Sequence, residues 1–440
     1  MKKTKQKKDE ITSTLSRITK VLFYLFVFLL PWQTVLILRE IFIQGEKFQY
    51  ATTGFYLFEA ILILYLFFSF YQRKYFKKNK KVNPLVLLFL FWSFLSILWT
   101  SDKFLTFSFS LHLILGTLLF FLLISLKKIN FQKAFQVFSI SISIQSLLAI
   151  FQFFTQQSFS NKYLGVSSQS AWQGGAHVLE NSLGRWLRGY GGLPHPNILG
   201  GFLVISLIFG IYYYLTLQKK EKTQRYISLI ILSVNFLALL ITFSRSAWMG
   251  FLVAIAIIIF LLRKKINKKL LQKTLSLFVV LAAIFSIFLF SYYELIFPRL
   301  APENRLESKS INERSVLLEE SKSIIKNNFF LGVGAGNYTN YLQQKSSEKK
   351  PVWKNQPVHN VFLLIFAELG IVGFLLFLGI LIFTFLEKIY FSYQKLTPLN
   401  IFVLSSIFAL IVISLFDHWL WTNVSGLILL WLILGFYKKS

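Results

Sequence analysis

Long apolar blocks separated by short polar stretches run through almost the whole chain and constrain its fold more than any other feature. About twenty apolar residues in a helix cover the roughly 30 Å core of a bilayer. In lipid the backbone must satisfy its own hydrogen bonds, so such blocks form helices. We therefore predict an all-α, polytopic transmembrane bundle of about twelve spans, at residues 21–38, 52–71, 84–100, 104–126, 134–154, 197–217, 226–243, 247–262, 275–293, 361–386, 398–416 and 421–436.

The composition agrees with a membrane protein and argues against a soluble domain. Hydrophobic residues make up 55% of the chain and the mean hydropathy is +0.59, whereas an ordinary soluble domain is at most about half apolar. We expect a single integral membrane domain over residues 1–440, with two long outer loops at 155–196 and 294–360.

Basic residues are concentrated in every second connection between the predicted spans. The two tails and five connections hold 30 of the 47 Lys and Arg residues but three of the 18 Asp and Glu residues; these connections are 73–81, 127–133, 219–225, 263–273 and 388–395. Because cytoplasmic loops carry such an excess, we predict both termini in the cytoplasm and both long loops on the outer face. The net charge of +29 therefore indicates orientation in the membrane, and we expect no nucleic acid partner.

The first outer loop, rich in Gly, Ser and Trp, is expected to be irregular, whereas the second contains an amphipathic pattern. Apolar residues recur at helical spacing from Leu317 to Ile325, after a possible capping box at Ser310 and Glu313. We predict a helix at about 311–328 with Arg314 on its apolar face, ended by the glycines that follow. Those glycines do not fit a nucleotide-binding loop, because they follow a helix instead of a strand.

Carboxylates are scarce in this chain, which contains three Asp residues at positions 9, 102 and 417. Enzymes that use cytoplasmic nucleotide sugars normally hold a divalent cation through carboxylates. We therefore expect no metal ion and no cofactor, and a substrate that is met at the outer face.

The predicted outer face carries arginine, histidine and asparagine side chains instead. A guanidinium forks onto phosphate oxygens, so arginines beside a membrane suit a phosphorylated lipid, and histidine can take a proton from a hydroxyl. The arginine candidates are Arg185, Arg188, Arg245 and Arg314. The other candidates are His195, Asn197, His359, Asn360 and Glu59.

Structural roles for several of these residues stay open. His195 lies between two prolines and could shape a turn, and a structural salt bridge to an arginine is favoured for Glu59. A charge at a tight junction between two spans is costly without a role, which favours function for Arg245. Solvated surface charges are the alternative for Arg185, Arg188 and Arg314. Structural or interfacial roles are assigned to His112, His177, Asp417 and His418.

Four motifs between residues 184 and 373 resemble the O-antigen ligase and polymerase family of membrane glycosyltransferases. His359-Asn360, nine residues and then Gly370-Ile-Val-Gly373 are similar to the ligase signature. Arg314-Ser-Val-Leu-Leu318 resembles the Arg-x-x-x-Leu element of the same outer loop. Two further segments resemble recurrent family sequences, Pro194-His-Pro-Asn197 and Ser244-Arg-Ser-Ala-Trp-Met-Gly250.

The resemblance implies an enzyme of the cytoplasmic (inner) membrane that moves a glycan from an undecaprenyl-diphosphate carrier to a hydroxyl of a glycan or glycolipid acceptor. Arg245 and Arg314 would hold the diphosphate, and His359 would act as the general base. The signature spacing favours a ligase-type transferase, with a polysaccharide polymerase of the same family second. A flippase or transporter comes third, because the charged residues gather at the outer rim and not at the bilayer midplane.

Overall fold

The computed structural model describes residues 2–72, 83–126, 128–181, 184–218, 220–263, 268–300, 305–345, 354–392 and 396–440. Parts of the predicted basic connections, including residues 73–82 and 264–267, lie outside these ranges. Each of the twelve predicted spans overlaps a helix, and these are α1 (Lys2–Leu29), α2 (Leu57–Tyr71), α3 (Pro84–Leu95), α4 (Lys103–Ser125), α5 (Phe131–Thr155), α6 (Pro196–Thr216), α7 (Lys222–Ile241), α8 (Arg245–Leu262), α9 (Lys268–Leu300), α12 (Val361–Ser392), α13 (Pro398–Ser414) and α15 (Val424–Lys439).

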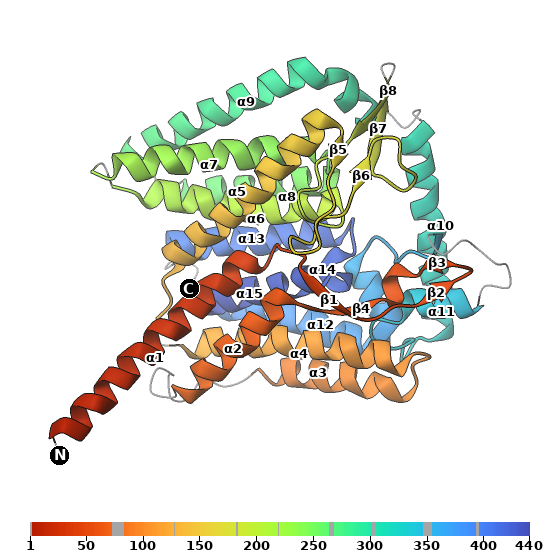
Figure 1. Ribbon diagram of the computed structural model, residues 1–440, viewed down its shortest axis with the longest axis horizontal. Coiled ribbons are helices and arrows are strands. Elements are labelled where there is room, and N and C mark those ends of the chain that lie inside the picture. The colour runs from red at the N-terminus through yellow and green to blue at the C-terminus, as the bar shows by residue number, and fades with distance from the viewer. Residues whose placement is uncertain are drawn as a thin grey trace.

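The predicted all-α polytopic bundle is confirmed. Among the described residues, seven helices are long and apolar enough to cross a membrane, and α2, α3 and α13 are shorter apolar helices. Helix α6 is the most buried of the seven, whereas α9 buries 11% of its most apolar window and lies at the edge of the bundle (Figure 1). Exposed apolar side chains on an edge helix are what lipid contact requires, since lipid tails replace the protein core as the apolar partner.

Polar residues at the helix starts explain where the spans begin. The Asp102 carboxylate accepts a hydrogen bond from the Leu105 amide and caps α4, and Ser244 caps α8 in the same way through Ala247. Proline stands in the first turn of α3, α6 and α13, where a backbone N–H would have no acceptor within the helix, so no helical hydrogen bond is lost.

The predicted first and second spans were too long at their outer ends. Helix α1 ends at Leu29, and β1 (Val35–Arg39) pairs antiparallel with β4 (Thr53–Tyr56), so that α2 begins at Leu57. Pro31 cannot continue the hydrogen-bond ladder of α1, and the β-branched Val35 and Ile37 suit a strand. Between them lie β2 (Phe42–Ile43), β3 (Glu46–Lys47) and a short 3₁₀ helix, η1 (Gln49–Ala51).

The first outer loop is not irregular, because it folds into two short hairpins. Strand β5 (Gln157–Ser158) pairs with β6 (Gln169–Ser170), and β7 (Val178–Asn181) pairs with β8 (Gly184–Leu187). These pairs give the loop a defined shape over the end of α5.

The predicted amphipathic helix of the second loop is α10 (Arg305–Asn327), and it begins about six residues earlier than predicted. Ser310 therefore lies inside the helix and does not cap it. The predicted inner face is confirmed at Leu317, Ser321 and Ile324, which are buried, although Leu318 is exposed. Two further short helices follow in the chain, α11 (Tyr338–Lys345) and α14 (Trp419–Thr422).

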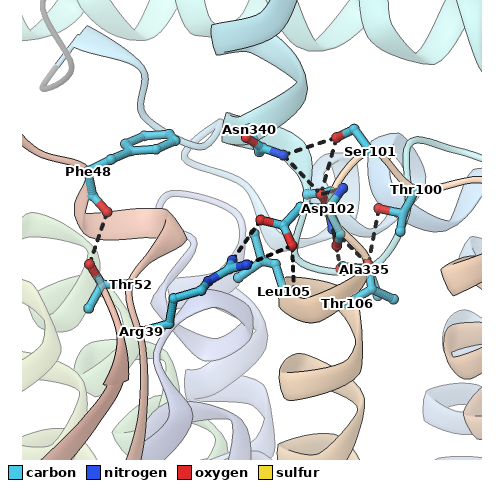
Figure 2. A network of polar contacts seen from close by, with 11 residues as sticks. Arg39, Phe48, Thr52, Thr100, Ser101, Asp102, Leu105, Thr106, Ala335 and Asn340 are labelled. Carbon is cyan, nitrogen blue, oxygen red and sulfur yellow. Dashed lines mark hydrogen bonds and ion pairs between the residues drawn. The ribbon is translucent and has the colours of Figure 1, made fainter. Parts of the chain in front are cut away.

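Both termini lie at one end of the bundle, whereas the strands, α10 and α11 gather at the other (Figure 1). A polar network fixes this second end (Figure 2). The Arg39 guanidinium binds both oxygens of Asp102 at 3.1 and 2.6 Å, and so ties β1 to the start of α4. Asn340 of α11 donates to the Ser101 hydroxyl at 3.0 Å, which ties the second outer loop to the same place.

Candidate functional site

Arg188 connects the first outer loop to two helices of the bundle. Its side chain is buried, and its Nε donates to the carbonyl of Thr242, just before α8, at 2.7 Å. Its Nη2 donates to the side-chain oxygen of Asn197 in the first turn of α6, also at 2.7 Å. A guanidinium held by two such bonds at a helix junction is a fixed structural charge of the site.

Asn197 connects Arg188 to Asp417, which precedes α14, through a second hydrogen bond. The Asn197 amide donates to Asp417 Oδ2 at 2.7 Å, while the backbone N–H of His418 donates to Oδ1 at 2.8 Å. Both carboxylate oxygens are therefore oriented. Burial by itself would raise the pKa of Asp417, but the neighbouring His359 and His418 together with these hydrogen bonds hold it below the usual value.

His359 faces Asp417 and His418 from the start of α12. Ligand atoms of the three residues all lie within 4.8 Å of one another, and the two histidine rings are 5.0 Å apart between centroids. Nδ1 of His359 is buried and has no hydrogen-bond partner within the described residues. Burial, with a smaller contribution from Arg314, lowers the pKa of His359, while Asp417 opposes that shift. The ring is thus neutral near pH 7 and able to accept a proton.

Asn360 fixes the position of His359. Its Oδ1 accepts a hydrogen bond from the Leu363 amide and caps α12, and its Nδ2 donates to the Leu415 carbonyl at the end of α13. An asparagine directly after the histidine therefore joins the segment that carries His359 to the segment that carries Asp417.

His195 lies beside the same cluster in a defined tautomer. Its Nδ1 accepts a hydrogen bond from the backbone N–H of Asn197 at 2.9 Å, so the ring proton is on Nε2. Burial lowers the pKa of His195 well below its usual value, and the charges of His177, Arg188, His359 and His418 act in the same direction. His195 is therefore a neutral hydrogen-bond donor at physiological pH, and it also caps α6.

Arg245 and Arg314 come from different helices, α8 and α10. Arg245 pairs with the buried carboxylate of Glu307 at 3.0 Å. The Arg314 guanidinium has no hydrogen bond or ion pair among the residues that the structure describes, although Asp417, Arg245 and Glu307 are near enough to act on its charge. Burial lowers the pKa of Arg314, but a guanidinium keeps its charge at any physiological pH. Arg314 is thus a partly buried cation that is available to an anionic ligand.

Two sequence candidates have other partners. Arg185 forms an ion pair with Glu180 across the β7–β8 hairpin, and Arg305 at the start of α10 binds the same carboxylate. Glu59 pairs with His112 at 2.5 Å between α2 and α4. The salt bridge expected for Glu59 exists, but its partner is a histidine and not an arginine.

Three residues of the site are not predicted from the sequence. The sequence assigns structural or interfacial roles to Asp417 and His418, and it gives no role to Glu307, which pairs with Arg245. A usable signal existed, because Asp417 is one of three Asp residues and lies in a predicted outer loop. The segment between α1 and α2 also contributes, since the Tyr50 ring of η1 lies 6.0 Å from that of His418 and the charge of Asp417 acts on Tyr50.

His359, Asp417 and His418 are also the group in the described residues whose ligand atoms are spaced closely enough to hold a metal ion. His418 Nδ1 is bonded to the Thr422 hydroxyl at 2.8 Å, which leaves Nε2 for a ligand or a proton. Arg314 acts on the same residues, and its positive charge opposes cation binding there.

Comparison with protein families matches residues 227–378 to the O-antigen ligases. This segment runs from α7 to α12 and includes Arg245, Arg314 and His359. The match confirms the resemblance to the O-antigen ligase and polymerase family that the sequence motifs indicated. No curated protein matches the chain. The chain is a multi-pass membrane protein whose residues 227–378 are similar to the O-antigen ligases.

Proposed function

We propose that this protein is a metal-independent membrane glycosyltransferase that moves a glycan from an undecaprenyl-diphosphate carrier to an acceptor hydroxyl. The observation that supports it most directly is the placement of Arg314 and His359 around Asp417. A guanidinium with no partner among the described residues suits a diphosphate, and a neutral, incompletely bonded imidazole beside a carboxylate suits a general base.

In the proposed reaction the acceptor oxygen attacks the anomeric carbon of the donor sugar. The bond between that carbon and the diphosphate oxygen breaks, and the carrier diphosphate leaves with the electron pair. His359 takes the hydroxyl proton, and Asp417 stabilises the imidazolium that forms. Arg314 and Arg245 stabilise the negative charge that grows on the leaving diphosphate.

The remaining candidates support this arrangement. Arg188 and Asn197 hold Asp417 through a chain of hydrogen bonds, and Asn360 holds the His359 segment. His195 is placed to donate through Nε2 to a substrate oxygen. Arg185 and Glu59 are assigned to the fold, since their partners lie outside the cluster.

We place the reaction at the outer face of the cytoplasmic membrane, with both termini in the cytoplasm. The support is the charge distribution together with the position of the site elements, at the end of the bundle opposite to the termini (Figure 1). The elements around the site include the two long loops, in which acidic residues offset most of the basic ones, unlike in the predicted cytoplasmic connections.

The direct test incubates purified protein with a lipid-linked glycan and one of two candidate acceptors, a glycolipid core or a second carrier-linked glycan, with a reaction that lacks acceptor as the control. Transfer to the glycolipid identifies a ligase, and extension of the carrier-linked glycan identifies the polymerase alternative. If the donor crosses a vesicle membrane without transfer to any acceptor, the protein is a flippase and the proposal is wrong.

A further inference from the structure

Helix α12 is broken in the middle of its apolar stretch, eleven residues after His359. Gly370 has φ 64° and ψ −172°, a conformation that is essentially restricted to glycine. A Cβ at this position would lie 2.1 Å from the carbonyl oxygen of Phe330. The glycine of the ligase signature is therefore the point where another segment packs directly on the α12 backbone.

That segment is the loop of residues 329–338, which follows the α10 helix of Arg314. Val333 donates its amide to the Ala367 carbonyl at 3.0 Å, and Gly334 donates to the Glu368 carbonyl at 2.8 Å. In return the amide of Ile371 donates to the Phe329 carbonyl at 2.8 Å. The loop thus supplies the hydrogen bonds that the break removes from α12, which is how irregular backbone is tolerated inside a membrane protein.

The Glu368 side chain is the centre of this contact. It is buried, and its Oε2 accepts hydrogen bonds from the Gly336 amide at 2.8 Å and from the Trp421 indole N–H at 2.7 Å. The Tyr338 amide lies 3.4 Å from Oε1. A carboxylate inside a span is costly unless it is fully bonded, so its presence there indicates a specific role.

Three segments of the proposed site meet at this carboxylate. Glu368 belongs to the helix that begins beside His359, about 14 Å along the axis. Gly336 belongs to the loop that follows the end of α10. A second contact holds this loop, because Asn337 donates to the Thr106 hydroxyl at 2.7 Å, next to the network in Figure 2. Trp421 lies in α14, directly after Asp417 and His418.

We propose that Glu368 is a positioning residue for the transfer reaction. Its carboxylate holds the loop after α10 and Trp421 of α14 against α12 beside the break, and so sets Arg314 and Asp417 relative to His359. The glycine-rich segment 332–336, predicted as a helix stop, is the part of the loop that makes this contact. The effect on transfer rests on the proposed function, whereas the contact of the loop with α12 can be tested without substrate.

The absence of native cysteine allows a direct measurement of this contact. Ser321→Cys places a reporter on the buried face of α10, at a residue whose hydroxyl bonds to the Leu318 carbonyl within the same helix. Glu319→Cys is the exposed reference on the same helix, and Ser405→Cys in the buried part of α13 reports on the bundle as a whole. Each is combined with Glu368→Gln and labelled with a water-soluble maleimide.

Glu368→Gln keeps the size of the side chain but turns one acceptor into a donor that faces other donors. An unsatisfied buried donor costs about 1–3 kcal/mol, so labelling at Ser321→Cys should accelerate about 5- to 150-fold, with no change at the other two positions. If labelling at Ser405→Cys rises equally, the variant has unfolded, and Trp421→Phe, which removes a single donor, replaces it in the same assay.

Activity separates positioning from simple support of the fold. Per mole of folded protein, Glu368→Gln should lower kcat by up to about 10²-fold, because a small displacement of reacting groups has that effect. Trp421→Phe should lower kcat less, and the double variant should lose less than the product of the two, since they share one hydrogen bond. Trp99→Phe is the matched control, because the Trp99 indole N–H is buried and has no partner in the described residues.

The proposal is overturned if the cysteine at position 321 stays protected from maleimide in Glu368→Gln. It is also overturned if labelling of that cysteine accelerates while kcat stays normal. A loss of kcat with a protected reporter also contradicts it, because Glu368 would then act other than through the loop. If the wild-type protein transfers no glycan to any acceptor, the proposed function fails, and the labelling result alone decides whether Glu368 holds the loop.

Discussion

The side chains of Asn197 and Asp417 are joined by a hydrogen bond of 2.7 Å although 220 positions separate them in the chain. This bond connects the two halves of the site, because Asn197 also accepts a hydrogen bond from Arg188 and Asp417 also faces His359. An amide that bridges a guanidinium and a carboxylate keeps the two charges apart. Arg188 therefore does not neutralise Asp417 directly, and the carboxylate stays available to the histidines.

Asp417→Asn should move the pH dependence of transfer in a defined direction. The base must be neutral, so kcat/KM falls as the pH drops through the pKa of His359, which burial places below 6.5. Asp417 raises that pKa, and removing its charge lowers it further. The acid limb should therefore shift to lower pH, while the plateau drops about tenfold or more because the base is weaker.

The control for that experiment is Asp102→Asn, which removes the carboxylate bound by Arg39 away from the histidines. It should leave the acid limb in place even if it lowers stability. An acid limb that does not move in Asp417→Asn would exclude Asp417 as the electrostatic partner of His359.

Lysine substitutions should separate Arg314 from Arg188. Arg314→Lys keeps the charge but loses the two-pronged contact with a diphosphate, and transfer should fall by about 10- to 100-fold with normal thermal stability. Arg188→Lys instead breaks bonds to Thr242 and Asn197, so the melting temperature should fall as well. Arg245→Lys can still pair with Glu307 and should be stable but impaired. Equal turnover of wild type and Arg314→Lys would show that charge alone suffices.

Metal ions test the proposal that the site works without one. Treatment with EDTA should leave transfer unchanged, whereas excess Zn²⁺ should inhibit it by occupying the nitrogens of His359 and His418 together with Asp417. Mg²⁺ should have little effect, since it prefers oxygen ligands. His418→Gln should reduce the Zn²⁺ inhibition. Loss of transfer in EDTA that Zn²⁺ restores would contradict metal independence.

Cysteine labelling of intact cells tests the proposed orientation. Trp172→Cys in the first outer loop is 75% exposed and should react with a membrane-impermeant maleimide added outside. Lys220→Cys, in the exposed connection between α6 and α7, should react only after permeabilisation. The reverse pattern would place Arg314 and His359 in the cytoplasm and remove the proposed carrier chemistry.

Hydropathy and motifs predict which helices form and which residues matter, but not how the residues pair. Span positions follow from local composition, and the end of α1 could have been read from Pro31. The contact of Asp417 with His359 depends instead on how α6, α12 and α13 pack, and no local pattern contains that information. The start of α10 was misplaced for a related reason, because the ion pair of Arg305 with Glu180 lies between distant segments.

His359→Gln is the variant for which a catalytic and an interfacial role differ most. A histidine at the outer start of a span can serve simply as a polar anchor, and an amide would then replace it at little cost. The structure gives a reason to expect more, because Nδ1 of His359 is buried with no partner in the part of the chain that the structure describes, and the ring faces Asp417. An amide cannot accept the acceptor proton, and loss of a general base costs about 10²–10⁴-fold in rate. Donor binding should persist, since Arg314 and Arg245 are intact.

The measurement compares transfer with binding of the lipid-linked glycan, for His359→Gln and for the neighbouring His418→Gln. His418 is bonded to Thr422, and burial, assisted by His359, lowers its pKa to about 3, so it is a weak base at neutral pH and its loss should cost less than loss of the general base. Normal donor binding with lost transfer in His359→Gln alone supports the base assignment. If both variants transfer normally, the cluster binds the diphosphate without taking the proton, and the acceptor hydroxyl must be activated elsewhere in the site.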